Sequence, residues 1–578
     1  MTMAMALAIT LAMTLGAVAP AFADDTQESL TSARRLIVNG AHELALARIE
    51  RGQSPGSARW ADWEGLRLRA LSELGRWSAV VARAEALSGA ALPPTVSAGF
   101  ARTTWLTGAQ AALRLQSAAT ARELAARVIW SPAASQDELR LARLVVIDSL
   151  FVARQPDLGY RAMLRYQQDH PAPDPAVAAR FVSLLVEHGL ARESLPWMTQ
   201  LGETHPVRIA AQVRLGLVTP AAARSQARAA VARGGDGQFW LALRAVGVTT
   251  GDALLVMEAS EQLINQSTPP AGSPGVQALW LDYAAASAVV ANREHLLNGD
   301  DFGWSNSAAR LAARDPASAR ALFAQLALQA RDAEALANAR VQLASALSEA
   351  RLALTAARLF DDRARFPAAV LGSDLRRLLG ELAAERGQFA LAADYWQGLP
   401  AGAGQDADQW QLMQAQAQAR AGRIDAATRI ATALYARKRP APSSAAIEAT
   451  VVFADLLSDA GEFSTARSVI ASLRDLLDAS PEAAVTPVAR RSLLLASASS
   501  GESGGNVVVA ADQYLLAAML EGFKPGEAQA LDARLQAARN LARAGLTEEA
   551  QAQLDWIRRN TRDPVLLEQV RREQARTK

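Results

Sequence analysis

The chain has 578 residues, and its 60 basic and 58 acidic side chains leave a formal net charge of +2. This near balance, without a dense basic stripe, argues against nucleic acid as a partner. Half of the residues are hydrophobic but only 5% are aromatic, and cysteine is absent, which excludes disulfides, thiolate metal sites and cysteine nucleophiles.

The first 23 residues have the pattern of a secretory signal peptide. Residues 1–23 form an apolar run that ends in Ala21-Phe22-Ala23, a small-x-small cleavage pattern, and Asp24 follows. We therefore expect cleavage after Ala23 and a soluble periplasmic chain. The run contains no Lys or Arg, and an uncleaved membrane anchor is the alternative interpretation. No later stretch is apolar and uncharged over the length of a transmembrane span, so none is expected after cleavage.

Residues 24–270 are predicted to form an N-terminal region of degenerate helical repeats. One hairpin is centred on Gly75, and Trp77 lies two places later, where the second helix packs on the first. Weaker copies begin at Gln116 and Gly189. Breakers rich in Pro and Gly recur about every 40 residues, with helical patterns between them. These features predict stacked helical hairpins, and no alternating pattern of the length of a β-strand competes with them.

A cluster of prolines and glycines from Thr268 to Gly275 is the densest of these breakers. We expect it to divide the repeats into two regions, the second of which covers residues 271–578. A long loop within one continuous array is the alternative.

The clearest pattern is a six-residue signature that recurs after about residue 350. A Gly is followed two places later by a mostly apolar residue, and Ala stands three places after that. Successive copies begin 35 to 44 residues apart, a period typical of repeat architectures. The signature runs through Gly387, Phe389 and Ala392; Gly422, Ile424 and Ala427; Gly461, Phe463 and Ala466; Gly505, Val507 and Ala510; and Gly545, Thr547 and Ala550, with a weaker copy from Ala350.

This signature has the chemistry of a turn between two packed helices. Gly adopts the left-handed conformation that ends the first helix, and Ala permits close approach of the second. The pattern is similar to the second-helix half of a tetratricopeptide repeat, over roughly residues 350–560. It departs from that family in its longer period and in lacking a regular Trp-x-x-Leu-Gly. The resemblance implies an all-α fold, a superhelical α-solenoid of stacked hairpins. The Gly-rich stretch 500–505 is interpreted as a flexible loop tip.

No pattern in the chain predicts a catalytic, cofactor or metal site. The five histidines lack metal-ligand spacing. His170 and His205, each followed by Pro, are expected to cap helix C-termini. The segment from Arg293 to Trp304 mixes His295 with acidic residues, but it lacks a calcium-loop pattern and is interpreted as a structural loop. Phosphate-binding glycine loops and nucleophile elbows are missing. We therefore expect a protein that is not an enzyme and needs no cofactor.

The predicted function is that of a scaffold or adaptor, which binds a protein or peptide partner in the groove of the helical array. A second interpretation is an accessory role in cell-envelope polysaccharide or peptidoglycan metabolism or export. The segment from Asp315 to Phe323 resembles the helical ring of soluble lytic transglycosylases and the repeat regions of polysaccharide exporters. No counterpart of the transglycosylase catalytic domain follows it, so this role would also be binding or assembly.

Overall fold

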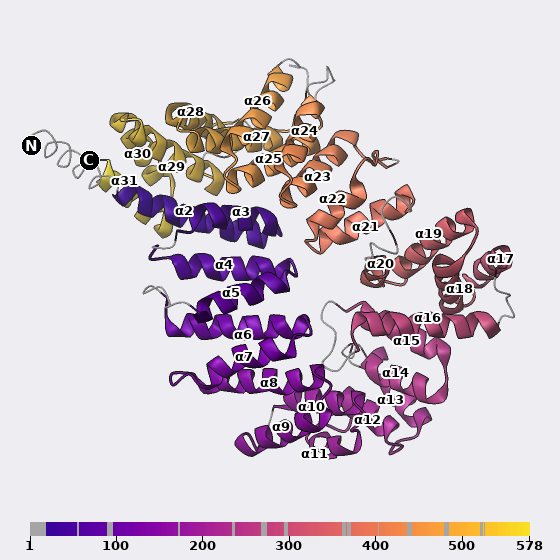
Figure 1. Cartoon of the computed structure of the whole chain (residues 1–578). Coiled ribbons are helices and arrows are strands. Elements are labelled where there is room, and N and C mark those ends of the chain that lie inside the picture. Colours follow the sequence, from indigo (N-terminus) through magenta and orange to yellow (C-terminus); the bar gives the residue numbers. More distant parts are fainter. Residues whose placement is uncertain are drawn as a thin grey trace, which may run out of the picture. The chain divides into compact units, whose positions relative to one another are not determined.

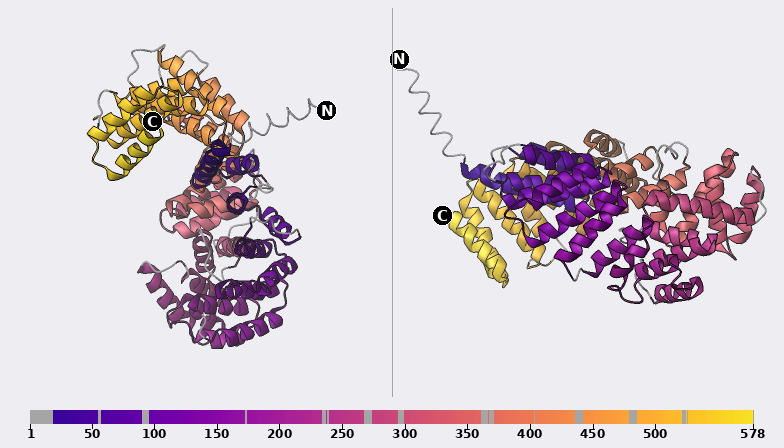
Figure 2. Two further views of the ribbon diagram at one scale, coloured as in Figure 1. Left: turned by 90° about the vertical axis from the view of Figure 1, so that its left-hand side faces the viewer. Right: turned by 60° about the horizontal axis from the view of Figure 1, so that its bottom comes forward.

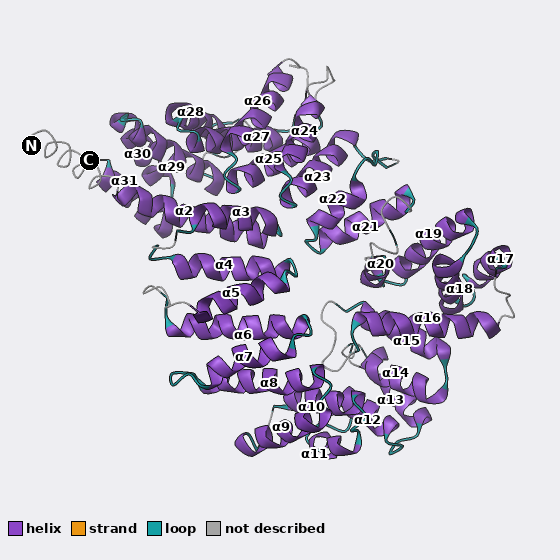
Figure 3. Ribbon diagram, in the orientation of Figure 1, coloured by secondary structure: helices purple, strands orange, loops and turns teal. Residues whose placement is uncertain are grey.

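Helices form the regular structure of the described part of the chain, and no strand occurs in those ranges (Figure 3). The predicted all-α fold of stacked hairpins is therefore confirmed. The computed structural model describes residues 19–54, 57–89, 96–171, 174–233, 237, 239–266, 274–293, 299–360, 366, 371–402, 404–435, 442–478, 485–520, 524 and 526–577.

Contacts divide the chain into two compact units, and the first is discontinuous in sequence. Unit 1 joins residues 1–74 to residues 387–578, and unit 2 covers residues 75–386. The described helices of unit 1, drawn in indigo and in orange to yellow in Figure 1, are α2 (Ala19–Val38), α3 (His42–Gly52), α4 (Trp60–Glu73), α22 (Phe389–Trp396), α23 (Ala407–Arg420), α24 (Ile424–Tyr435), α25 (Ser444–Asp459), α26 (Phe463–Asp478), α27 (Pro487–Ser503), α28 (Val507–Ala518), α29 (Ala528–Arg543), α30 (Thr547–Asn560) and α31 (Pro564–Arg576).

Unit 2 is a second array of the same kind. Most of its helices pack on their neighbours in the chain, as those of unit 1 do. Its described helices are α5 (Trp77–Gly89), α6 (Ala98–Arg114), α7 (Ala118–Ile129), α8 (Gln136–Val152), α9 (Pro156–Asp169), α10 (Pro175–Glu187), the 3-10 turn Arg192–Ser194, α11 (Leu195–Met198), α12 (Pro206–Arg214), α13 (Pro220–Ala232), α14 (Phe239–Thr250), α15 (Ala253–Ile264), α16 (Val276–Arg293), α17 (Asp301–Leu311), α18 (Pro316–Gln329), α19 (Ala333–Glu349), α20 (Ala353–Leu359) and α21 (Ser373–Glu385).

One turn geometry connects the helices of most hairpins. A residue with positive φ ends the first helix, and the second helix begins two residues later. Polar side chains then cap many of the first helices of the hairpins: Ser135 and Glu138, for example, form a capping box at the start of α8, which satisfies two backbone N–H groups. The positive-φ residue of these turns is Gly40, Gly75, Gln116, Arg154, Gly251, Arg351, Gly387, Gly422, Gly461, Gly505 or Gly545.

Two of the weaker repeat copies differ from their predicted form. The copy placed at Ala350 is out of register by one residue, because the positive φ of 61° belongs to Arg351 and α20 begins at Ala353. The copy at Gly189 has the expected positive φ, but it is followed by the 3-10 turn Arg192–Ser194 and the four-residue helix α11 in place of a full second helix. Both copies depart from the regular spacing of Gly, an apolar residue and Ala, and the local structure departs from the regular turn as well.

The N-terminal hairpin of α2 and α3 packs on the C-terminal array within unit 1. Helix α2 contacts α25, and α3 contacts α23; Figure 2 shows the array of α22 to α31 from two further sides. Residues about 400 positions apart therefore share one packed unit, so the sequence order of the hairpins is not their packing order.

The predicted boundary between 24–270 and 271–578 falls in unit 2, at residues 267–273, which lie outside the described residues. Helices on either side of it pack together, since α15 contacts α16, α18 and α20. The boundary stays a prediction. Residues 1–18 of the predicted signal peptide also lie outside the described residues, and Ala23 lies in α2. None of the helices in the described ranges is long and apolar enough to cross a membrane.

Candidate protein-binding groove

Helix α3 lies across the turns of three successive hairpins of the C-terminal array. A Cβ atom at Gly40 would approach Phe389 Cε2 to 2.9 Å, and one at Gly422 would lie 3.2 Å from Glu43 Cβ. Farther along α3, a Cβ atom at Gly461 would lie 2.5 Å from the guanidinium of Arg48. Gly40, Gly422 and Gly461 therefore have a second role besides adopting a positive φ. Because they lack a side chain, they leave room for α3 to approach the hairpin turns.

Polar contacts hold the N-terminal hairpin in this place. The Arg51 guanidinium donates to the Ala460 carbonyl at 2.5 Å and pairs with Glu462 at 3.3 Å. From α2, Arg35 pairs with Asp459 at 2.6 Å and donates to the Ser32 hydroxyl at 3.2 Å. These contacts join the first hairpin to the end of α25 and the turn after it.

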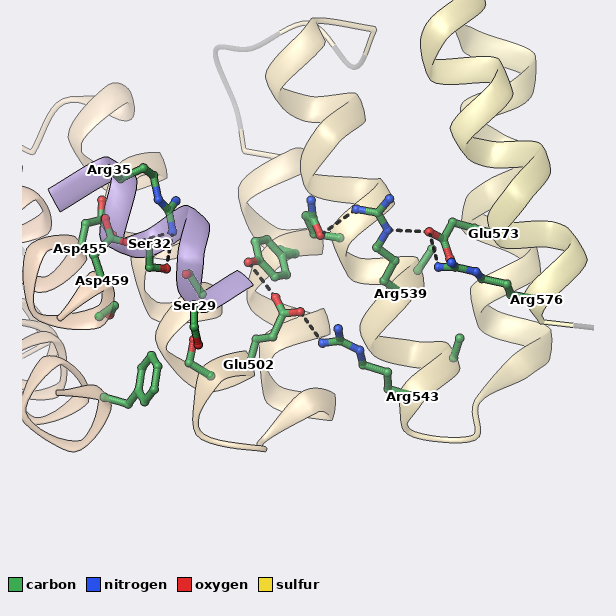
Figure 4. A pocket seen from close by; sticks show the side chains of 18 of the residues that line it. Ser29, Ser32, Arg35, Asp455, Asp459, Glu502, Arg539, Arg543, Glu573 and Arg576 are labelled. Carbon is green, nitrogen blue, oxygen red and sulfur yellow. Dashed lines mark hydrogen bonds and ion pairs between the residues drawn. The ribbon is translucent and has the colours of Figure 1, made fainter. Parts of the chain in front are cut away.

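A second set of arginines and carboxylates follows α27 to α31 (Figure 4). Glu502 accepts from Arg543 at 2.6 Å and from the Tyr514 hydroxyl at 3.2 Å. Glu573 pairs with Arg539 at 3.0 Å and with Arg576 at 3.7 Å. Since these residues come from four helices, α27, α28, α29 and α31, the pairs also link neighbouring hairpins.

Most of these side chains line one cleft of about 1460 Å³ within unit 1, whereas Arg51 and Glu462 are not part of its lining. The N-terminal hairpin supplies Ser29, Ser32, Arg35, Asn39 and Arg48, and the C-terminal array supplies the rest of the lining. The cleft is therefore incomplete without residues 29–48. Figure 4 shows the row of charged side chains from α2 across to α31.

The cleft changes the acidity of the groups in its wall. Desolvation raises the pKa of Asp455 to about 6; the Asp459 carboxylate adds to this shift, and Arg35 opposes it. Desolvation also raises the pKa of Asp459, against the pull of Arg35 and Arg48. Burial and then the charge of Glu502 raise the pKa of Tyr514. Asp459 and Tyr514 are held by their contacts with Arg35 and Glu502.

The residues predicted to pack the repeats lie at the turns and contacts of the hairpins. Gly75, Gly387, Gly422, Gly461, Gly505 and Gly545 all have positive φ. Trp77, Phe389, Ile424 and Phe463 are partly buried at the starts of their helices. The alanines of the signature, Ala392, Ala427, Ala466, Ala510 and Ala550, are fully buried. What each contributes to stability stays a prediction.

The four described histidines lie at helix ends, with one difference from expectation. His205 precedes α12 and caps its N-terminus, where its ring Nδ1 accepts from the Val207 backbone N–H at 3.3 Å. The expectation of a C-terminal position was wrong. Burial lowers the pKa of His205, which favours the neutral ring that this acceptor role requires. His170 follows the end of α9, as expected.

The mixed segment from Arg293 is described only in part, and His295 lies outside the described residues. Asp300 caps α17 by accepting from the Gly303 backbone N–H at 2.8 Å. Asp301 accepts from the backbone N–H groups of Arg331 and Asp332. Both acids thus have structural hydrogen bonds. Across the described ranges, no group of three or more His, Asp or Glu side chains is placed to hold a metal ion.

Sequence reasoning did not find the cleft. Its charged residues come from α2, α3, α25, α27, α29 and α31, at positions where the repeat signature carries no information. The interpretation of the Gly-rich stretch 500–505 as a flexible tip is wrong for residues 500–503, because α27 continues to Ser503. Glu502 of this helix lines the cleft. The only available signal was helical spacing, since Arg539 and Arg543 are four residues apart on one helix face.

No family model matches this sequence, and no curated protein is similar to it. Solved structures resemble it over most of its length. The yeast Tom70 crystal structure has 12% identity, covering 82% of this chain and 95% of that chain, with a TM-score of 0.25. The Cut9-Hcn1 hetero-tetramer of the APC/C has 9% identity, with coverages of 94% and 95% and a TM-score of 0.24. The Naa15/Naa10 complex bound to HypK-THB has 11% identity, with coverages of 97% and 93% and a TM-score of 0.23. TM-scores this low support no statement about a partner or an activity of this chain.

Proposed function

We propose that this protein is a non-enzymatic scaffold or adaptor that binds a protein or peptide partner in the cleft of unit 1. The observation that carries the proposal is the cleft itself, about 1460 Å³ in volume and lined mostly by polar and charged side chains. Pockets for small molecules are typically about 300–1,000 Å³ and mostly apolar. A larger, polar cleft suits an extended polypeptide, whose backbone and side chains offer many hydrogen-bonding groups.

The arrangement of the cleft supports binding by a preformed surface. Arg35, Arg543 and Arg539 are already held by carboxylates of neighbouring helices. Side chains that are ordered before binding lose less conformational freedom when a partner arrives. The hairpin array supplies the rigid support, because each hairpin packs on the next.

We also propose that the protein works in the periplasm after cleavage behind Ala23. The apolar run of residues 1–23 and its small-x-small ending motivate this location. N-terminal sequencing of the exported protein should begin at Asp24. Full-length chain found only in the membrane fraction would contradict the proposal and favour an anchor.

The binding function is tested by affinity capture from an envelope extract, with the mature chain as bait. The cleft variant Arg543→Gln/Arg576→Gln is compared with the control Arg558→Gln/Arg571→Gln. Arg558 lies on α30 and Arg571 on α31; both are exposed, and neither lines the cleft. A partner should be retained by the wild type and the control and lost from the cleft variant. The retained protein is then purified, and its affinity is measured by calorimetry.

Two outcomes would contradict the proposed function. One is that no protein distinguishes the cleft variant from the control. The other is that the purified wild type turns over peptidoglycan or a peptide, which would make it an enzyme. Cell-envelope polysaccharide added as a competitor tests the second interpretation, because a polysaccharide partner should then displace the captured protein.

A further inference from the structure

We infer that the cleft of unit 1 selects an acidic polypeptide segment, one with several Asp or Glu side chains along an extended chain. This inference rests on the proposed function and specifies the chemistry of the partner. Its basis is a difference in solvent exposure between the positive and the negative side chains of the cleft. The guanidinium groups stand towards solvent, and the carboxylates that bind them lie beneath.

The exposed fractions of the paired side chains show this difference. Arg35 is 58% exposed and its partner Asp459 only 14%. Arg543 is 59% exposed, and Glu502 is 22% exposed. The same order holds at the far end of the row, where Arg576 is 75% exposed and Glu573 is 15% exposed. A ligand entering the cleft therefore meets positive groups first.

The guanidinium groups also keep hydrogen-bond donors for a ligand. Each guanidinium has five N–H donors, whereas Arg543 uses one nitrogen for Glu502 and Arg576 uses one for Glu573. Glu573 is shared between Arg539 and Arg576, so two cations are offset there by one anion. A carboxylate of the partner can thus bind an arginine that remains in its present ion pair.

A basic segment does not fit this arrangement. Its lysines would approach the exposed guanidinium groups before reaching the recessed carboxylates of Asp459, Glu502 and Glu573, and like charges repel. Asp455 is a more exposed carboxylate of the lining, but it is outnumbered by the exposed Arg35, Arg543 and Arg576. Nucleic acid is also disfavoured, because Asp455, Asp459, Glu502 and Glu573 all line the cleft and a phosphate backbone carries a charge at every step. An acidic peptide places its charges more sparsely, and its neutral residues can pass over these carboxylates.

The experiment measures fluorescence anisotropy of labelled peptides with the mature chain, at low and at high salt. The probes are a peptide of alternating Glu and Ser, its counterpart with Lys in place of Glu, a neutral Gly-Ser peptide and an oligothymidylate. The Glu peptide should bind at least about tenfold more tightly than each of the other probes, and its affinity should fall as salt rises.

Three variants separate recognition from damage to the fold. Arg543→Gln/Arg576→Gln should weaken binding of the Glu peptide about tenfold, whereas Arg558→Gln/Arg571→Gln should leave it within about twofold. Glu502→Gln removes a recessed negative charge, so it should tighten binding of the same peptide. A tighter complex cannot result from a damaged fold. Circular dichroism checks that each variant retains its helices.

The inference is overturned if the Glu peptide fails to bind, if the Lys peptide or the oligothymidylate binds as well, or if Glu502→Gln weakens binding. These results leave the proposed function standing when affinity capture still yields a partner that depends on the cleft. If capture yields none, the proposed function fails independently.

Discussion

The hairpin turns of the two units have one geometry but different residues at the left-handed position. In the C-terminal array of unit 1 this residue is Gly at five successive turns, from Gly387 to Gly545. In unit 2, Gln116, Arg154 and Arg351 have positive φ values of 59°, 55° and 61°. Helix packing therefore imposes the turn, and Gly only lowers its conformational cost.

Two core regions, one from each unit, differ as well. Around α28, buried Ala510, Ala530 and Ala537 bring helices of unit 1 close together. In unit 2 the core around α10 contains Phe181, Trp197 and other large side chains. Unit 2 also contains a buried ion pair of Glu261 and Arg320. The buried alanine contacts of unit 1 should accordingly be sensitive to added volume, and the Glu261–Arg320 pair of unit 2 to the loss of one partner.

The largest expected effect is that of Arg320→Met in unit 2. Arg320 donates to both oxygens of the fully buried Glu261, at 2.9 and 2.7 Å, and the Tyr283 hydroxyl donates to the same carboxylate. Removing one partner leaves a buried charge without compensation, which costs about 3–5 kcal/mol. Urea unfolding followed by circular dichroism measures this loss, and hydrogen exchange by mass spectrometry should locate it in unit 2.

Arg228→Met is the matched control for this change. Arg228 pairs with Glu258 on the surface of the same unit, and exposed pairs contribute at most about 1 kcal/mol. Equal losses in the two variants would mean that the buried pair is no more important than a surface pair.

The second effect concerns added volume in unit 1. Replacing Ala392, Ala427 or Ala466 with Leu should cost about 1–3 kcal/mol, because each alanine is fully buried where two helices meet. Thermal unfolding by calorimetry tests this. Ala433→Leu, at an exposed position of α24, should change stability by less than about 0.5 kcal/mol. If the buried variants melt like the wild type, these alanines do not set the helix spacing.

A smaller effect compares the turns directly. Gly505 and Gly545 have no neighbour that an added Cβ atom would meet, so Gly→Ala there tests conformation alone. Each change should cost about 1 kcal/mol, the strain of a left-handed L-residue. Gln116→Gly should relieve a similar strain in unit 2 and gain a few tenths of a kcal/mol, since glycine also has more freedom in the unfolded chain. The midpoints of urea unfolding measure both changes in stability. If Gly→Ala in unit 1 and Gln116→Gly in unit 2 changed stability in the same direction, strain at the left-handed position would not explain the two effects.

This comparison explains how much of the fold the sequence predicts. The turns at Gly387 to Gly545 were found because Gly and Ala recur in register, and the helical fold followed. The turns at Arg154 and Arg351 were missed or misplaced, since packing there forces a residue with no local preference for the left-handed region.

The candidate site was not predictable for a different reason. Arg35 and Asp459 are 424 positions apart in the sequence and meet only because α2 packs on α25. A repeat signature describes contacts between neighbouring hairpins, whereas this contact joins the first hairpin to the end of the array. Exposed Arg and Glu residues on helices are also common, so their types alone do not mark a cleft.

The smallest effect is a pH dependence of unit 1. The cleft raises the pKa of Asp455 to about 6, above the value near 3.9 of an unfolded chain. The folded state therefore binds more protons between these values. The stability from this group is fully present below about pH 4 and is lost as the pH rises through 6. Although the surrounding protein partly desolvates this carboxyl group, Asp455 keeps contact with solvent in the cleft, so screening should limit the loss to under about 1 kcal/mol.

Asp455→Asn should remove this loss, so the variant should be more stable than the wild type at pH 8 and about equal to it at pH 4. Urea unfolding across that range measures the difference. Asp406→Asn is the contrasting variant: backbone N–H donors, Gln409 first, lower the pKa of Asp406, so its contribution is present above the unfolded value and is lost as the pH falls. The two variants should therefore change the pH profile in opposite directions, and parallel changes would show that the wall of the cleft does not desolvate Asp455.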